Sequence, residues 1–480
     1  MCCCHIIFRS ALLHWTEASF VDPLEGIPRF LINFLSSTVQ CSKVIMNTQI
    51  LTFLLIVLEC SWNVRSIEQP TEKIRVGAEV LLSTKYEAFL GVKKLGVIAN
   101  PTSILPSTME HIVDRMHKDD IQGLLPVELT AVFGPEHGFR GDHQAGSGGA
   151  KQVKDRQTNL TVYSTYGMKQ VDLVRLIEKT DVDGIVFDIQ DVGARYYTFI
   201  WTMFDMMCAA AATKNRFNFF VLDRPNPLGG KTVRGPMLQP EYVSGVGKVA
   251  GIPVVHGMTV GELAKYFNEK AMATCDVATS DAVQQVNLTV VRMEGWNPLN
   301  AFPTNQLPWV LPSPNMPTLQ TAMVYPGTCL LEGTSLSEGR GTTRPFQIIG
   351  AAYLDYTFSL ELMDAVPSMC GVLLRETFFI PTFSKFAGKI SAGVDITVTD
   401  PSCFDPIRLA VEILTLAKKH APSNFSWING NDVDILSGSN FTRIAIDEAR
   451  SVDFIMSHYS LELQKSGFME ERKSFFWYPR

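Results

Sequence analysis

Residues 184–189 read GIVFDI and lead directly into the polar segment 190–195, QDVGAR. The same pattern occurs at 94–102 (KLGVIANPT), 127–138 (VELTAVFGPEHG) and 217–227 (FNFFVLDRPNP). The segments between these runs carry helical patterns, at 109–118, 172–179 and 199–213. Near-continuous apolar strands that alternate with helices are typical of a parallel sheet covered on both faces. The sequence therefore predicts an α/β fold with a Rossmann-like, mostly parallel sheet.

The four apolar runs all end in polar residues. In a parallel sheet the carboxyl ends of the strands share one edge, and ligands bind there. One such end is commonly a helix cap, but four together predict an active-site edge. In chain order the candidates are Asn100, then Glu136 and His137, then Asp188, Gln190, Asp191, Arg195 and Tyr196, and finally Asp223, Arg224 and Asn226.

The most unusual stretch is FGPEHGFRG at 133–141, in which two glycines and a proline constrain the backbone beside Glu136 and His137. A general acid for glycosidic cleavage needs a carboxyl group whose pKa is raised by an apolar setting. The two phenylalanines of this stretch can provide part of that setting. The alternative is that Glu136 caps a helix or pairs with Arg140 in a rigid turn.

The third cluster contains a strand aspartate that is costly to bury unpaired. Asp188 is therefore expected to meet Arg195 or a substrate hydroxyl. Tyr196 and Tyr197 can offer a flat apolar face to a sugar ring, or they can be core aromatics. His256 precedes a helix with the capping box Thr259 to Glu262, and it either points into a cleft or has a structural role.

The sequence changes character near residue 300. Five prolines lie within 303–317, and helical patterns follow at 405–420 and 443–465. We predict a catalytic domain at 67–306 and a smaller C-terminal α/β domain at 307–480 that closes the cleft. Its Pro- and Gly-rich loops carry Asn315, Glu338 and Arg340, and an arginine between glycines is well placed to bind a carboxylate with two nitrogens.

Several function classes lack their motifs. No GxGxxG follows a first strand, and GxxxxGK[ST], HExxH and GxSxG are absent. We therefore predict no cofactor and no metal site. The 42 Lys and Arg residues do not outnumber the 48 Asp and Glu residues or form a basic stripe, so no nucleic-acid partner is predicted.

The N-terminal region indicates export. The apolar run at 50–58 is shorter than the roughly 20 residues that span a bilayer, which predicts a signal peptide at 46–66 after an unstructured extension at 1–45. The alternative is a genuine N-terminal segment with a buried strand. Sequons at Asn159, Asn287, Asn424 and Asn440 agree with a secreted, extracellular or endolysosomal protein that has no membrane association after cleavage.

Five cysteines follow the predicted signal peptide: Cys208, Cys275, Cys329, Cys370 and Cys403. This odd number without a CxxC pair argues against a disulfide scaffold or a zinc ribbon. One or two disulfides are possible, and Cys370–Cys403 is the expected pair. Most of the five cysteines are expected to be buried as small apolar residues.

Five blocks of this sequence resemble the NamZ-type exo-β-N-acetylmuramidases, formerly a family of unknown function. They are FGPEHGFRG, FDIQDVGARYYT, VLDRPNPLGG, HGMTVGELA and the long block at 311–346, within a resemblance that spans 76–478. The resemblance implies a Rossmann-like catalytic domain, a smaller C-terminal domain and an active site in the cleft between them. It also implies release of N-acetylmuramic acid from the non-reducing ends of peptidoglycan fragments, with Glu136 catalytic. Ser335 stands where the family pattern has an asparagine, which affects substrate contacts and not the fold.

The working hypothesis is hydrolysis in which Glu136 protonates the leaving oxygen, with His137 beside it. Asp188, Asp191, Asp223, Glu338 or the substrate's own N-acetyl group is the second reacting group. Arg340 or Arg195 is expected to bind the lactyl carboxylate, and the remaining predicted substrate contacts are Asn100, Tyr196, Arg224, Asn226, His256 and Asn315. An inactive amino-sugar or muropeptide-binding protein is the competing hypothesis, and a nucleotide-dependent oxidoreductase is disfavoured by the missing glycine motif.

Overall fold

The structure is a computed structural model that describes residues 73–480, apart from 215, 278–283, 301, 303–305, 367–368 and 431. The predicted extension at 1–45 and signal peptide at 46–66 lie outside the described residues. Among the described residues, no helix combines the length and the apolar character needed to cross a membrane.

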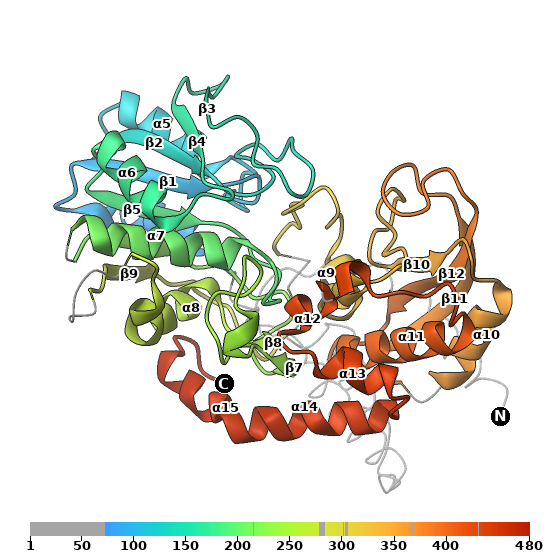
Figure 1. Cartoon of the computed structure of the whole chain (residues 1–480). Coiled ribbons are helices and arrows are strands. Elements are labelled where there is room, and N and C mark those ends of the chain that lie inside the picture. The colour runs from blue at the N-terminus through green and yellow to red at the C-terminus, as the bar shows by residue number, and fades with distance from the viewer. Residues whose placement is uncertain are drawn as a thin grey trace, which may run out of the picture. The chain divides into compact units, whose positions relative to one another are not determined.

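A seven-stranded sheet forms the first half of the described chain (Figure 1). Its order is β3-β4-β2-β1-β5-β6-β9, and every neighbouring pair is parallel except β3 with β4. The strands are β1 (Lys94–Ala99), β2 (Glu128–Gly134), β3 (Gln152–Lys154), β4 (Thr161–Ser164), β5 (Gly184–Asp188), β6 (Asn218–Leu222) and β9 (Asn287–Val291). Without β3, the six parallel strands follow the order of a doubly wound Rossmann sheet, with the change of direction between β1 and β5. The predicted fold class is confirmed.

Helices cover both faces of this sheet. One core contains α6 (Gln170–Thr180), α7 (Phe199–Thr213) and α8 (Val260–Tyr266), while the other contains α4 (Gly77–Ser83) and α5 (Ile112–Ile121). Alternate residues of β1 enter opposite cores, as expected of a strand buried on both faces. The helix α7 has the predicted bounds. The helix α5 begins later than predicted, because the His111 side chain caps it by accepting from the Val113 N–H.

The second half contains a three-stranded antiparallel sheet, in the order β10-β12-β11. Its elements are α9 (Leu319–Thr328), β10 (Ile348–Ala351), α10 (Tyr356–Ala365), β11 (Val372–Phe379), β12 (Ser391–Val398) and α11 (Pro406–His420). The pair β7 (Arg234–Met237) and β8 (Pro253–Val255) forms a separate two-stranded sheet.

The helix predicted at 443–465 is wrong as a single element. The structure has α12 (Asp432–Ser437), α13 (Phe441–Asp447), α14 (Val452–Ser466) and α15 (Phe468–Glu471) in this region. Ala449 adopts a left-handed conformation with φ +53°, and the Ser451 side chain caps the start of α14. These two residues therefore separate α13 from α14.

The chain end returns to the first half. In Figure 1, α14 and α15 run back towards α8. The Tyr478 hydroxyl donates to Asp223 at 2.7 Å, and Arg480 pairs with Glu262 of α8 at 2.5 Å. Buried side chains of α7, α9 and α11 also belong to one continuous core. The boundary between 306 and 307 stays a prediction.

Two disulfides occur in the structure. The predicted Cys370–Cys403 pair is confirmed, and Cys208 of α7 pairs with Cys275 across 67 residues of sequence. The sequence leaves a second disulfide open, and the expectation that most of the five cysteines are unpaired is wrong, because the fold also brings the Cα atoms of Cys208 and Cys275 to 5.7 Å. Cys329 is free and buried.

Candidate active site

Glu136 lies in the turn after β2 and is 9% exposed. Its Oε1 accepts from the Gly146 N–H at 2.8 Å, and its Oε2 is 2.7 Å from the Thr198 hydroxyl. The Tyr166 hydroxyl also lies beside this carboxylate; burial, then the charge of Glu136, raises the pKa of Tyr166. The alternative pairing of Glu136 with Arg140 is wrong, because Arg140 forms ion pairs with two other aspartates, Asp114 and Asp155.

The next residue, His137, has φ +70°. A left-handed conformation is costly for a residue with a side chain, and such strain is concentrated at functional sites. The following loop holds the conformation: the His137 N–H donates to Ser147 at 2.8 Å, and Nδ1 lies 3.1 Å from the His143 carbonyl. Burial lowers the pKa of His137, so its imidazole is neutral at neutral pH.

Asp191 follows β5 and is buried. Its Oδ2 accepts from the Gly193 N–H at 2.7 Å, whereas its Oδ1 has no hydrogen-bond partner within the described residues. Burial raises the pKa of Asp191 to about 7. Gly193 has φ +81°, and a Cβ atom there would lie 2.2 Å from the Asn226 amide oxygen. The turn that presents Asp191 therefore requires glycine at this position.

Two adjacent tyrosines point to different surroundings. The Tyr196 hydroxyl donates to the Pro326 carbonyl, so this side chain serves the framework. The Tyr197 hydroxyl is buried beside Ser313, and Tyr197 packs edge-on against Phe199 and Tyr325 with ring centroids 5.1 and 5.6 Å away. The sequence prediction named Tyr196, but no sequence signal distinguishes the two tyrosines.

Tyr197 links the strand-end carboxyls to the second half of the chain. Burial raises the pKa of Tyr197 well above its ordinary value, the charges of Asp191 and Glu136 raise it further, and that of Arg340 lowers it. The charge of Arg340 also contributes to the lowered pKa of His137. These charges come from three separate segments: the turn after β2, the turn after β5 and the loop that carries Arg340.

Arg340 is held by acidic neighbours. Its Nε and Nη2 donate to Glu332 Oε1 at 2.9 and 2.5 Å, and Glu338 lies 3.4 Å from Nε and 3.0 Å from Lys385. No hydrogen bond to Arg340 Nη1 occurs in the part of the chain that the structure describes. Asn315 donates to Gln144 at 3.2 Å, which ties the second half to the loop after Glu136.

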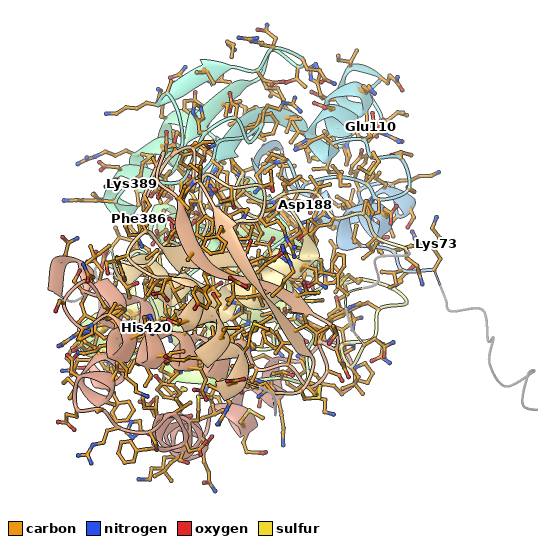
Figure 2. All side chains as sticks on the ribbon, turned by 90° about the vertical axis from the view of Figure 1, so that its right-hand side faces the viewer. Lys73, Glu110, Asp188, Phe386, Lys389 and His420 are labelled. Carbon is orange, nitrogen blue, oxygen red and sulfur yellow. A yellow bond between two sulfur atoms is a disulfide. The ribbon has the colours of Figure 1, made fainter. Side chains whose placement is uncertain are left out.

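Asp188 and Arg224 form a closed ion pair. Arg224 donates to both carboxylate oxygens, at 2.6 and 2.9 Å, and the two side chains are 0% and 4% exposed. Figure 2 shows Asp188 deep among the packed side chains. The predicted pairing of Asp188 with Arg195 is wrong. The terminal nitrogens of Arg195 donate to the carbonyls of Pro236, Ile252, Leu436 and Ser437, so Arg195 is not placed to contact a substrate.

Both carboxylate oxygens of Asp223 are also occupied by hydrogen-bond donors. Its oxygens accept from Thr259, Tyr478, the Gly261 N–H and the Arg224 N–H at 2.7–3.0 Å, while burial raises its pKa to about 7. The predicted capping box of Thr259 and Glu262 is confirmed.

Three other predicted contacts are enclosed by the fold. His256 is fully buried, and burial lowers its pKa to about 3. The Asn226 amide donates to the Met258 carbonyl at 3.0 Å. Asn100 accepts from the Thr102 N–H and hydroxyl at 2.9 and 2.6 Å. All three side chains therefore lie within the framework around the site, and Asn100 Nδ2 and His256 Nε2 have no hydrogen-bond partner among the described residues.

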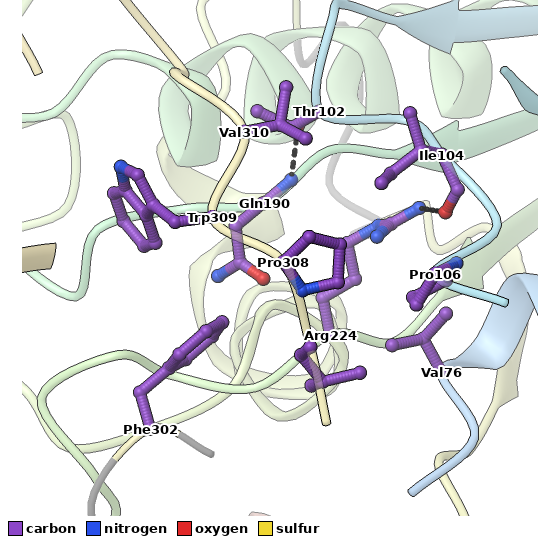
Figure 3. A pocket seen from close by; sticks show the side chains of 11 residues that line it. Val76, Thr102, Ile104, Pro106, Gln190, Arg224, Phe302, Pro308, Trp309 and Val310 are labelled. Atoms are coloured by element: carbon purple, nitrogen blue, oxygen red, sulfur yellow. Dashed lines mark hydrogen bonds between the residues drawn. The ribbon is translucent and has the colours of Figure 1, made fainter. Parts of the chain in front are cut away.

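A small pocket lies at the change of strand direction between β1 and β5 (Figure 3). Thr102, Gln190 and Arg224 line it, together with the rings of Phe302 and Trp309. The Gln190 N–H donates to the Thr102 hydroxyl at 2.9 Å, and the Gln190 side-chain amide donates to the Asp191 carbonyl at 2.8 Å. The lining does not include Glu136 or Asp191, so the pocket adjoins the carboxyl cluster through Gln190.

Comparisons with known proteins agree with this architecture. The family model described as exo-beta-N-acetylmuramidase NamZ, N-terminal, matches residues 95–320, and its C-terminal counterpart matches 323–478. A peptidoglycan beta-N-acetylmuramidase NamZ from Bacillus subtilis (strain 168) is 39% identical over 406 residues, covering 85% of this chain and 92% of the relative.

Two solved structures of DUF1343 family proteins from Bacteroides fragilis NCTC 9343 also match. One is 28% identical with a TM-score of 0.74, and the match covers 85% of this chain and 100% of the matched chain. The other is 26% identical with a TM-score of 0.61, covering 85% and 99%.

Proposed function

Since the chain belongs to the NamZ family of exo-β-N-acetylmuramidases, which are glycoside hydrolases, we propose that it hydrolyses peptidoglycan-derived saccharides. The specific reaction is release of β-1,4-linked N-acetylmuramic acid from the non-reducing end. The observation that carries the proposal is a pair of buried carboxyl groups in the turns after β2 and β5: Glu136, whose Oε2 accepts from the Thr198 hydroxyl, and Asp191, whose Oδ1 has no hydrogen-bond partner among the described residues. Glycoside hydrolases use a pair of carboxyl groups beside the scissile bond.

The hydrogen bonds narrow the choice of the second reacting carboxyl. Asp188 is bound through both oxygens by Arg224, and Asp223 has four donors. Glu338 lies between the cations of Arg340 and Lys385. Asp191 Oδ1 has no hydrogen-bond partner among the described residues, so Asp191 is the strand-end acid with an oxygen available to a substrate.

Arg340 is the candidate receptor for the lactyl carboxylate that distinguishes muramic acid from glucosamine. Its Nη1 carries no hydrogen bond from the residues that the structure describes, while its other two nitrogens are fixed by Glu332. Arg195, the other predicted receptor, donates to four backbone carbonyls. The proposal therefore assigns the lactyl group to Arg340.

Export to an extracellular or endolysosomal compartment is part of the proposal. Disulfides persist in oxidising compartments, and the described chain contains two. The asparagines of all four sequons are exposed, as glycosylation requires: Asn159, Asn287, Asn424 and Asn440. Sequencing the N-terminus of secreted protein tests this point. We expect a start after residue 66, and a mature chain that retains Cys41 would contradict it.

Activity is tested with a chromogenic β-N-acetylmuraminide. We expect turnover by the wild type and none by Glu136→Gln. Glu128→Gln is the matched control, because Glu128 is exposed at the opposite end of the same strand. Wild-type binding of muropeptide sugars without turnover would instead indicate an inactive amino-sugar-binding protein.

A further inference from the structure

We propose that Asp191 donates the proton to the glycosidic oxygen and that Glu136 acts as its ionised partner. This inference rests on the proposed function and deepens it. It reverses the role that the sequence analysis gave to Glu136. The two carboxyl groups meet different neighbours in the folded chain.

Glu136 is surrounded by hydrogen-bond donors. The Gly146 N–H, the Thr198 hydroxyl and the Tyr166 hydroxyl all face its two oxygens. A backbone N–H can only donate, so the bond from Gly146 requires an acceptor oxygen. Donors on both oxygens stabilise the ionised form of a carboxyl group. Both oxygens of Glu136 are therefore engaged as hydrogen-bond acceptors.

Asp191 has the opposite surroundings. Its donors are the N–H groups of Val192 and Gly193 in its own turn, and Oδ1 is buried without a partner in the described part of the chain. Nor does any described cation form an ion pair with it. A buried anion with a bare oxygen is costly, whereas a protonated Oδ1 is a free donor. The neutral acid is therefore the state that this turn favours.

Burial alone does not separate Asp191 from its neighbours. Asp223 is equally buried, but its four donors leave no oxygen for a substrate. The unpaired Oδ1 is the feature that distinguishes Asp191. Buried side-chain polar atoms are rarely left unpaired in native proteins, and a ligand is one of the ordinary reasons for an exception. Here the glycosidic oxygen would be the missing partner.

The reaction balances with these roles. The bond between the anomeric carbon and the glycosidic oxygen breaks, its electron pair stays on that oxygen, and the Asp191 proton attaches there. The carboxylate of Glu136 faces the positive charge that develops at the anomeric carbon. Water supplies the hydroxyl group of the released sugar, and its remaining proton goes to a carboxylate of the pair. The sum is hydrolysis without any further reactant.

The test uses two leaving groups. A general acid matters for a poor leaving group such as the 4-hydroxyl of N-acetylglucosamine, and little for 2,4-dinitrophenolate, which departs without a proton. We expect Asp191→Asn to lower disaccharide turnover by about a hundredfold to ten-thousandfold while dinitrophenyl glycoside turnover stays within about tenfold of wild type. Glu136→Gln is expected to lose both activities.

The outcomes distinguish a wrong assignment of the two carboxyl roles from a wrong proposed function. The reverse pattern, or equal losses on both substrates in Asp191→Asn, would overturn the assignment of roles and leave the proposed function standing. A wild type inactive on both substrates would overturn the proposed function itself. Asp364→Asn, at an exposed position of α10, is the matched control, and thermal unfolding of each variant shows that the fold is intact.

Discussion

Two groups of buried acids lie at the same edge of the parallel sheet, and they differ in one respect. Asp188 and Asp223 form what we call the closed cluster, because every oxygen of these two carboxylates accepts a hydrogen bond. Glu136 and Asp191 form the open cluster, in which Asp191 Oδ1 has no hydrogen-bond partner among the described residues. Burial raises the pKa of Asp191 and that of Asp223 to about 7. The unpaired oxygen of Asp191, and not residue type or burial, therefore distinguishes the open cluster from the closed one.

The largest expected effect comes from breaking the closed cluster. Arg224→Met leaves the Asp188 carboxylate buried without its cation, and removing one partner of a buried ion pair costs about 3–5 kcal/mol of unfolding free energy. Urea denaturation measures the loss. The double variant with Asp188→Asn should recover part of it. A single-variant loss below about 1 kcal/mol would mean that the pair is not structural.

Replacing aspartate by asparagine should have opposite effects on the unfolding free energy in the two clusters. The folded-state pKa of Asp191 is about 7 against 3.8 ordinarily, so the folded state retains a proton that the unfolded state has released between these values. Its contribution to stability therefore falls as pH rises from about 4 to 7. At 1.36 kcal/mol per pKa unit, Asp191→Asn stabilises the protein above pH 7 by at most about 4 kcal/mol.

Asp223→Asn is expected to destabilise at the same pH. Its new amide would place donors against the Thr259 and Tyr478 hydroxyls and the N–H groups that now donate to the carboxylate. Thermal unfolding of both variants at pH 5 and pH 8 checks the comparison. Equal signs for the two substitutions would remove the distinction between open and closed clusters.

The two adjacent tyrosines sharpen the comparison further. Tyr197→Phe removes a hydroxyl at the open cluster, so we expect kcat/KM to fall by about tenfold to a hundredfold with little change in stability. Tyr196→Phe removes the bond to the Pro326 carbonyl and should lower stability by about 1 kcal/mol with kcat preserved. Steady-state kinetics and unfolding curves of both variants test this difference between activity and stability. Similar kinetic losses would contradict the placement of Tyr197.

Arg340 provides the smallest and most selective effect. Arg340→Met should weaken binding of N-acetylmuramic acid by about tenfold relative to N-acetylglucosamine, because a hydrogen bond to a charged group contributes about 1.5–3 kcal/mol. Calorimetric titration with both sugars measures the ratio of the two dissociation constants. General damage to the site would weaken both sugars alike, and that result would remove Arg340 as the lactyl receptor.

Local patterns predicted much of this molecule. The apolar runs 94–99, 127–133, 184–189 and 217–222 became β1, β2, β5 and β6, each within one residue at either end, and α7 has its expected bounds. Family membership, expected from five sequence blocks, is confirmed. Apart from the helix bounds at α5 and at 443–465, the errors arose where distant segments meet. The disulfide of Cys208 joins residues 67 apart, and the carbonyls that occupy Arg195 include two more than 240 positions away.

The sequence by itself determined the fold class and the edge where the polar strand ends gather, because strand and helix periodicity are local properties of the chain. Only the tertiary structure decided which of those polar groups remain available. Thr198 reaches Glu136 across 62 residues and Tyr478 reaches Asp223 across 255. A carboxyl group is closed or open according to such long-range donors, and no short stretch of sequence carries that information.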